Sequence, residues 1–316
     1  TMNNPLLKKF LTYNGTAPFS KIKNKHFKPA FLEGIKNAKK EIDAIIKNKS
    51  IPSFENTIEA LEFSGQQLDR ISSIFFNLNS AETNDEIQEI AQEVSPLLSE
   101  FSNDITLNEE LFKKVKLVNE IKDDLNLSAE QQMLLTNKYK SFVRNGANLN
   151  AEQKIELRKI DAELAKLKLK FGENVLAETQ AFELHITAKE QLKGLPEGVI
   201  EAAEIIAKQK EKEGWVFTLD YPSYVPFLTY AEDRNLREKM SLAFGAKAFQ
   251  NNKNDNQQIV LDLVNLRYKR ATLLGYNSHA HFVLEERMAE TPANVITFLD
   301  DLLEKAKPAA IQEVHK

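Results

Sequence analysis

The sequence contains no cysteine among its 316 residues, and this absence removes several classes of chemistry. Disulfide bonds, thiolate metal sites and cysteine nucleophiles are excluded, whatever the compartment. Glycine is scarce, with 10 residues, and neither the P-loop pattern nor the dinucleotide-binding fingerprint occurs. A G-x-S-x-G nucleophile elbow is missing as well. Nucleotide chemistry is therefore poorly supported, and a serine hydrolase has little in its favour.

A basic excess and a long apolar run are also missing. The 42 Lys and Arg face 46 Asp and Glu, so the formal charge of −4 leaves no surplus to neutralise phosphates, and we expect no nucleic acid partner. No apolar stretch reaches the length of a membrane span. The start, TMNNPLLKKF, lacks the features of a signal peptide, although Thr1 precedes Met2. The compartment stays open between the cytoplasm and, if a signal preceded Thr1, the periplasm or the exterior.

Helical periodicity is what the sequence does contain. Apolar residues recur at intervals of three and four along most of the chain, which predicts amphipathic helices and a mainly α fold. We expect such helices from Pro29, after Pro52 as far as Leu78, over residues 150–180, 196–213 and 233–240, before Gly275, and from Thr291–Pro292 onward.

Local signals mark the ends of several of these helices. Three hydroxyl residues with a partner three positions later fit capping boxes: Thr83 with Glu86, Ser128 with Gln131, and Thr187 with Glu190. Pro96 falls inside a periodic run, where we expect a kink or a restart capped by Ser95.

Two short segments depart from helical spacing. Residues 182–186 and 215–219 alternate or are rich in aromatics, which predicts two short strands that pair across a helix. The tyrosines of YPSYVP at 221–226 either line a groove for a peptide or pack at a helix entry, and the Asn-rich stretch 251–258 is expected to be a polar loop. Without repeats or a Gly/Ser linker, residues 1–316 are expected to form a single helical unit.

The histidines are the main candidates for a metal site. His279 and His281 lie in the stretch YNSHAHFVLEERM, two positions apart, so on a helix they point in different directions and cannot chelate one ion. His281 and Glu285 are four apart and supply two ligands at most, whereas a catalytic zinc usually takes three protein ligands and water. A surface or capping role is the preferred interpretation of this stretch.

Specific strings then carry a resemblance to a known family. They include NPLL at the start, PFSKI, HFKPAF with the following EG, PSFENTIEALE with SG, TNDE, NDI, ELF, ATLLG and METP, all in the same order as in the family. With them, nearly the whole chain resembles the N-terminal part of the M3 family of zinc peptidases, and most of all its peptidyl-dipeptidase members.

The resemblance implies an almost wholly helical, two-lobed zinc enzyme with a deep channel that admits short peptides and releases dipeptides from a free C-terminus. The zinc motif of the family is H-E-x-x-H, in which two histidines bind zinc and the glutamate takes a proton from the bound water. No His-Glu pair occurs here, because the five histidines precede Phe27, Ile186, Ala280, Phe282 and Lys316.

We therefore expect residues 1–316 to be the N-terminal region of a longer metallopeptidase, a truncated form or a proteolytic remnant that ends inside a helix at AAIQEVHK. Zinc would belong to the full-length enzyme, together with the missing C-terminal catalytic half and the short peptide substrates. This chain is expected to bind no zinc and to be inactive alone, and no catalytic, cofactor-binding or metal residue is assigned. The alternatives are a stand-alone helical interaction protein and a metal protein that uses His281 and Glu285.

Overall fold

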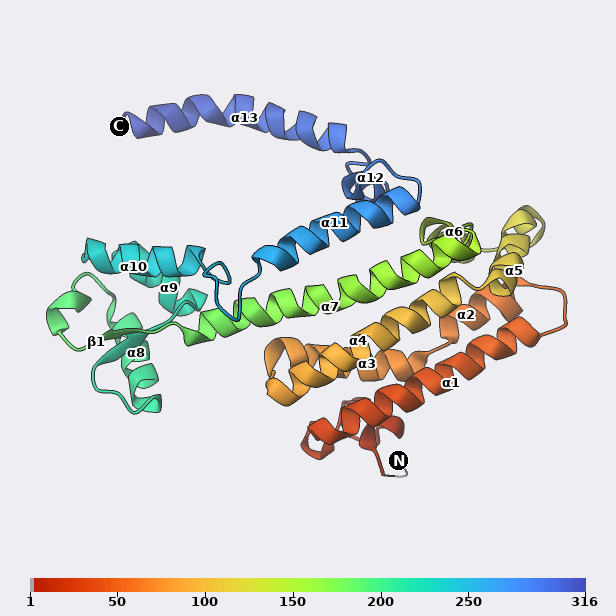
Figure 1. Ribbon diagram of the computed structural model, residues 1–316, viewed down its shortest axis with the longest axis horizontal. Helices are drawn as coiled ribbons and strands as arrows, with labels where there is room; N and C mark the ends of the chain where they lie inside the picture. Colours follow the sequence, from red (N-terminus) through yellow and green to blue (C-terminus); the bar gives the residue numbers. More distant parts are fainter. Residues whose placement is uncertain (1–2) are drawn as a thin grey trace. The chain divides into compact units, whose positions relative to one another are not determined.

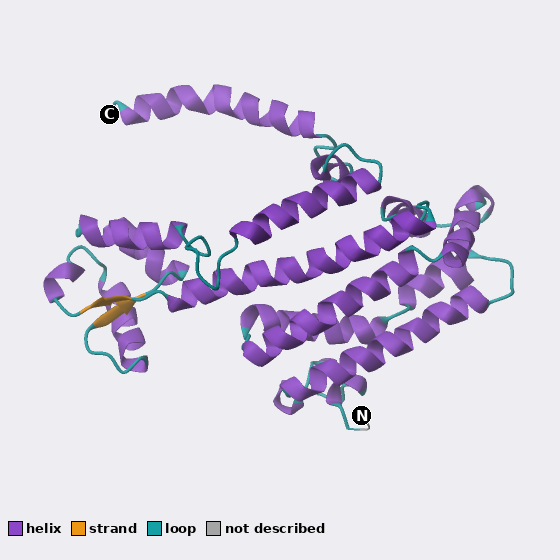
Figure 2. Cartoon of the chain, in the orientation of Figure 1, coloured by secondary structure: helices purple, strands orange, loops and turns teal. Residues whose placement is uncertain are grey.

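A computed structural model describes residues 3–316, and Figures 1 and 2 show that helices dominate it. The longer helices before the strands are α1 (Phe27–Lys47), α3 (Gln66–Ala81), α4 (Asp85–Thr106), α5 (Glu109–Glu120), α6 (Ala129–Arg144) and α7 (Ala151–Ala181). The α-helices after β1 are α8 (Glu197–Gln209), α9 (Tyr221–Tyr230), α10 (Arg234–Gly245), α11 (Gln257–Leu273), the short α12 (His279–Leu284) and α13 (Pro292–Val314). A π-helical segment, Phe54–Glu59, leads into the short α2 (Ala60–Phe63).

The strands are β1 (Leu184–Ile186) and β2 (Trp215–Phe217). They pair antiparallel with Leu184 opposite Phe217 and together form the two-stranded sheet found in the described residues (Figure 2). The expected mainly α fold with a small two-stranded element is confirmed.

Backbone contacts divide the chain into two compact units. The first comprises the chain up to Lys166 together with Val264–Lys316, and the second is Leu167–Leu263. Both boundaries fall inside helices, α7 and α11, rather than in linkers. The sequence gives no sign of this division, because the helical pattern continues unchanged across both boundaries.

Unit 1 is held together by phenylalanines. Phe27 and Phe31 of α1 meet Phe75 of α3 edge to face, with ring centroids 5.0 and 5.3 Å apart, and Phe76 joins them 5.0 Å from Phe75. Phe75 is fully buried. Such edge-to-face pairs add to the free energy from burial alone, so this cluster fixes α1 against α3.

Unit 2 has its own smaller core around the two strands. Phe217 of β2 lies 4.8 Å from Phe227 of α9, and both are fully buried. Gly214, just before β2, has φ +86°, and a Cβ there would lie 2.3 Å from the Ile186 carbonyl oxygen. A side chain at position 214 would therefore clash with β1, so this close approach of the two chain segments requires glycine.

Several boundaries predicted from the sequence are confirmed. Ser128 accepts a hydrogen bond from the Gln131 backbone, and the Gln131 side chain accepts one from the Ser128 backbone, a capping box at the start of α6. The long helix over residues 150–180 is α7, and Thr291 caps α13. Gly275 follows α11 with φ +90°.

Other predictions are wrong for local reasons. The run after Pro52 is broken at Gly65, whose φ of +74° starts a new helix, α3. Asn84, not Thr83, caps α4, because the amide side chain accepts from the Ile87 backbone. No side-chain cap forms at Thr187, where a short 3₁₀ turn follows Ala188.

Two helices contain the prolines that entered the predictions from sequence. α4 continues through Pro96, so the restart capped by Ser95 is wrong, because one lost backbone donor is outweighed by the buried apolar face on both sides. The YPSYVP stretch forms the start of α9, with Pro222 in its first turn, where the missing N–H costs nothing. Tyr224 stacks on Phe244 at 4.2 Å, so this tyrosine packs on α10.

Within residues 3–316, no helix combines the length and the apolar character needed to cross a bilayer.

Candidate functional site

The histidine stretch forms the short helix α12 and its cap. Ser278 accepts a hydrogen bond from the His281 backbone at 3.2 Å, and its hydroxyl lies 2.7 Å from Nδ1 of the same histidine. Both groups are exposed. A serine and a histidine at this spacing cap a helix, which agrees with the preferred interpretation.

Glu285 is engaged by groups other than His281. Its carboxylate accepts a 2.6 Å hydrogen bond from the Tyr276 hydroxyl and pairs with the Arg144 guanidinium. Burial and the bond to Glu285 raise the pKa of Tyr276 above its ordinary value. The carboxylate that was the second candidate ligand therefore anchors α12 to α6.

Arg144 is the centre of this anchor. It donates to the Phe282 carbonyl at 2.8 Å, and its guanidinium lies 4.4 Å from the centre of the Phe282 ring. Only 13% of its side chain is exposed. Because a planar cation between a carboxylate, a carbonyl and a ring satisfies most of its donors, Arg144 fixes the turn that leads into α13.

A second polar link ties α11 to α7 and α4. Arg270 donates to Asp161 at 2.7 Å, and Asn103 donates to the other oxygen of Asp161 at 3.0 Å. The two charged side chains are only 17% and 15% exposed. These residues were missed in the sequence, where an isolated Asp or Arg on a helix face looks like any solvated charge.

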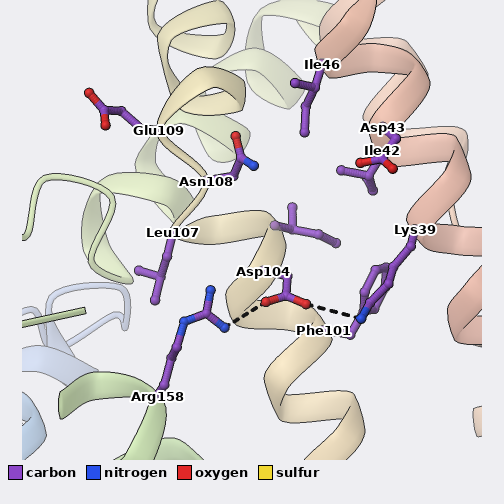
Figure 3. Close-up of a pocket in the computed structure, with 11 residues that line it drawn as sticks. Lys39, Ile42, Asp43, Ile46, Phe101, Asp104, Leu107, Asn108, Glu109 and Arg158 are labelled. Carbon is purple, nitrogen blue, oxygen red and sulfur yellow. Dashed lines mark hydrogen bonds and ion pairs between the residues drawn. The ribbon is translucent and has the colours of Figure 1, made fainter. Parts of the chain in front are cut away.

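Beside Asn103 lies the cavity drawn in Figure 3, with a volume of about 490 Å³. Arg158 of α7 and Lys39 of α1 converge on Asp104 from opposite sides, at 2.8 and 3.5 Å (Figure 3). The rest of the lining mixes apolar side chains with polar ones: Ile42, Asp43, Ile46, Phe101, Ile105, Leu107, Asn108 and Glu109.

The chemistry of this cavity is limited. Asp104 is already shared by two cations, and no nucleophile lies beside a general base in the lining. The three charged side chains are more than a third exposed or close to it, so their ion pairs add little stability. The cavity is therefore lined by residues of α1, α4, α5 and α7 and offers no catalytic constellation.

Metal ligands are not grouped either. Among residues 3–316, no cluster of three or more His, Asp or Glu side chains has the arrangement to hold a metal ion. His26 accepts from the Lys23 backbone at 2.9 Å, and His185 lies 2.6 Å from the Glu213 carbonyl. The residues present therefore do not fit a zinc site, and no catalytic step can be derived from them.

Helix α13 is the most unusual element of unit 1. None of its residues is buried, yet it carries a series of large apolar side chains with about half or more of their surface exposed. They are Ile296, Phe298, Leu299, Leu302, Leu303, Ile311 and Val314. An amphipathic helix with an uncovered apolar face is typical of an interaction surface.

Comparison with known proteins finds relatives over nearly the whole chain. The model of peptidase family M3 matches residues 227–316. Dipeptidyl carboxypeptidase of Escherichia coli is 36% identical over 99% of the chain, and oligopeptidase A of Haemophilus influenzae is 33% identical over all of it. Saccharolysin of Saccharomyces cerevisiae is 26% identical over 92%.

The chain is similar to members of peptidase family M3 over nearly its whole length, and the family model itself matches the C-terminal part of the chain. The resemblance drawn from short strings is thereby confirmed, and it covers nearly the whole sequence. The chain spans less than half the length of these relatives, 46% of both the dipeptidyl carboxypeptidase and the oligopeptidase A. The exposed face of α13 lies within the part of the chain that the family model matches.

Proposed function

We propose that this chain is the N-terminal region of a zinc-dependent peptidyl-dipeptidase that hydrolyses short peptides and releases C-terminal dipeptides. The observation that carries the proposal is the 36% identity to a dipeptidyl carboxypeptidase over 99% of the chain but only 46% of that relative. The zinc ligands, the general base and the second half of the protein would all lie beyond Lys316. The charge of −4 supports a peptide rather than a nucleic acid as partner.

The contribution of this chain would be to enclose and orient the peptide. Helices with exposed apolar faces supply a rigid wall, and a bound peptide held by such a wall has lost the freedom that otherwise opposes reaction. The Arg144 and Arg270 links support this role, because they hold α12 against α6 and α11 against α7. Zinc chemistry would be supplied by the other half.

The first experiment reads the gene downstream of the Lys316 codon. An H-E-x-x-H motif there, followed by release of dipeptides from short peptides by the extended protein, is the expected result. The activity should be lost with a chelator and restored with zinc. A stop codon directly after Lys316 would favour the stand-alone helical interaction protein instead.

The second experiment assays the 316-residue chain alone. We expect no release of dipeptides and no stoichiometric zinc, because the histidines present do not form a ligand set. Turnover by this chain that is abolished by a chelator would contradict the proposal, and bound zinc lost in a His281→Ala variant would support a metal site at His281 and Glu285.

A further inference from the structure

A second cavity, of about 480 Å³, lies within unit 2 and differs in character from that of Figure 3. Its apolar walls are Phe171 and Val175 of α7, Phe249 of the loop between α10 and α11, and Val260 and Leu261 of α11. Lys247 stands in the same lining. The volume is within the range of about 300–1,000 Å³ that is usual for ligand sites.

The loop that forms one wall is held by buried amides. Asn256 is 4% exposed and donates to the Phe171 carbonyl at 3.1 Å, while Asn174, 2% exposed, donates to the Asn256 side-chain oxygen at 2.8 Å. The Asn256 backbone also donates to the Ala248 carbonyl at 2.8 Å. Because buried amides with all partners in place fix one geometry, the cavity is formed before any ligand arrives.

The loop adopts an unusual backbone conformation at the cavity wall. Ala248 is 3% exposed and has φ +56°, a left-handed conformation that favours glycine. Glu178 of α7 holds the outer part of the loop by accepting from Asn252 at 2.9 Å and Asn254 at 3.2 Å. A non-glycine residue keeps this conformation only where its surroundings enforce it, which is typical of a preorganised site.

The cavity combines exposed apolar surface with one positive charge. Phe249 is 63% exposed, Leu261 58% and Val260 43%, although all three line a concave surface. The Lys247 ammonium lies 3.8 Å from the centre of the Phe244 ring. An apolar group beside an anionic one is complementary to this arrangement.

We propose that this cavity binds an apolar side chain of a peptide substrate, with an adjacent acidic residue of the peptide facing Lys247. This rests on the proposed function for the choice of a peptide. In an enzyme that releases C-terminal dipeptides, only two residues follow the scissile bond, whereas the chain before it extends by about 3.3–3.6 Å per residue. We therefore assign to this cavity a residue that precedes the scissile bond.

The test measures binding of acetyl-Glu-Leu-Ala-Ala-Ala to the 316-residue chain by calorimetry. Replacing the peptide leucine by serine, or Leu261→Ser in the protein, should weaken binding about tenfold, as expected for an apolar side chain that loses its contact. Replacing the peptide glutamate by glutamine, or Lys247→Gln, should weaken it about threefold and remove part of its salt dependence.

Two variants serve as matched controls. Val264 lies on the same helix and is 57% exposed, so Val264→Ser repeats the change outside the cavity. Lys253 lies in the same loop without lining the cavity, so Lys253→Gln repeats the loss of charge. Both should bind the peptide as the unchanged chain does. Equal losses in the control variants, with folding intact by circular dichroism, would overturn the proposal.

Further measurements distinguish a peptide from other ligands of the cavity. Decanoate also joins an apolar body to a carboxylate, and if it binds through Leu261 and Lys247 while the peptide does not, the site is one for fatty acids and the proposal is wrong. Loss of peptide binding when the protein is extended beyond Lys316 would mean that the missing half covers the cavity. Peptide binding without dipeptide release by the extended protein would overturn the proposed function and leave the cavity's assignment intact.

Discussion

The aromatic cluster of the N-terminal helices and the last helix, α13, use phenylalanine in opposite ways. Phe75 is fully buried between α1 and α3, whereas Phe298 of α13 is 62% exposed. The first region completes its core with its own residues. The second presents apolar surface that no described residue covers, which is typical of an interaction surface.

The largest expected difference in the free energy of unfolding is between variants that replace a phenylalanine in each of these two regions. Phe75→Ala leaves a cavity in the aromatic cluster and should lower the free energy of unfolding by about 3–5 kcal/mol. Phe298→Ala, the same change on an exposed face, should alter it by less than about 0.5 kcal/mol. Urea unfolding followed by circular dichroism measures both. Similar losses for the two variants would mean that α13 is packed in solution and that the contrast is wrong.

Removing a partly buried ion pair should likewise cost more stability than removing an exposed one, although both changes are smaller than that expected for Phe75→Ala. Arg270→Met leaves Asp161 as a partly buried charge with only Asn103 as a donor, and should cost about 2–3 kcal/mol, less than a fully buried pair because its side chains are 17% and 15% exposed. Lys305→Met removes a pair on α13 whose side chains are 72% and 54% exposed, and should cost under about 0.5 kcal/mol.

The measurement is again urea unfolding, now at two salt concentrations. Added salt should reduce the effect of Lys305→Met further and leave that of Arg270→Met nearly unchanged, because buried pairs are screened less. A salt-sensitive Arg270→Met effect would show that Asp161 is solvated.

The sequence predicted what depends on neighbours along the chain. Helical spacing located α1, α7, α11 and α13, and a hydroxyl with a glutamine three positions later located the start of α6. The predictions at Thr83 and Ser95 failed because another interaction was stronger than the local sequence signal. Asn84 caps α4 in place of Thr83, and the buried apolar face of α4 keeps the helix continuous past Ser95.

The polar sites depend on residues that are distant in sequence, and periodicity contains no information about them. Arg144 meets Glu285 across 141 positions, and Arg270 meets Asp161 across 109. The histidine pair was visible because it is local, and the helical conformation expected for it is confirmed by α12. The family resemblance supplied the rest, since many short strings in one order identify a relative even when no catalytic motif is present.

A charge cluster in unit 2 is more exposed than the Arg270–Asp161 pair and less exposed than the Lys305–Asp301 pair. Glu183 pairs with both Lys210 and Lys212, and its side chain is 24% exposed. The hydrogen bonds from the two lysines lower the pKa of Glu183 to about 2. Since the folded pKa is below the ordinary value of 4.5, its contribution to stability is complete above that pH and is lost as the pH falls toward 2.

Glu183→Gln should therefore lower stability at pH 7 by under about 1 kcal/mol, after allowance for screening by solvent. Thermal unfolding at pH 7, 4.5, 3 and 2 should show the two proteins converging as the acid limit is approached. A constant difference at every pH would mean that the variant acts through packing rather than through charge.

The smallest effect on unfolding should come from the face of α13, where the informative quantity is self-association. Leu302 is 46% exposed beside Leu299 and Leu303, so Leu302→Glu should change the free energy of unfolding by less than about 0.5 kcal/mol. The unchanged chain should associate as its concentration rises in sedimentation velocity, because the apolar face has only another copy to cover it, and Leu302→Glu should weaken that association about tenfold. Leu242→Glu places the same charge on a leucine of α10 that is more accessible, 65% exposed, and should leave association unchanged. If both variants reduce association alike, the added charge acts through general repulsion, and the apolar face of α13 is not the surface through which copies of the chain associate.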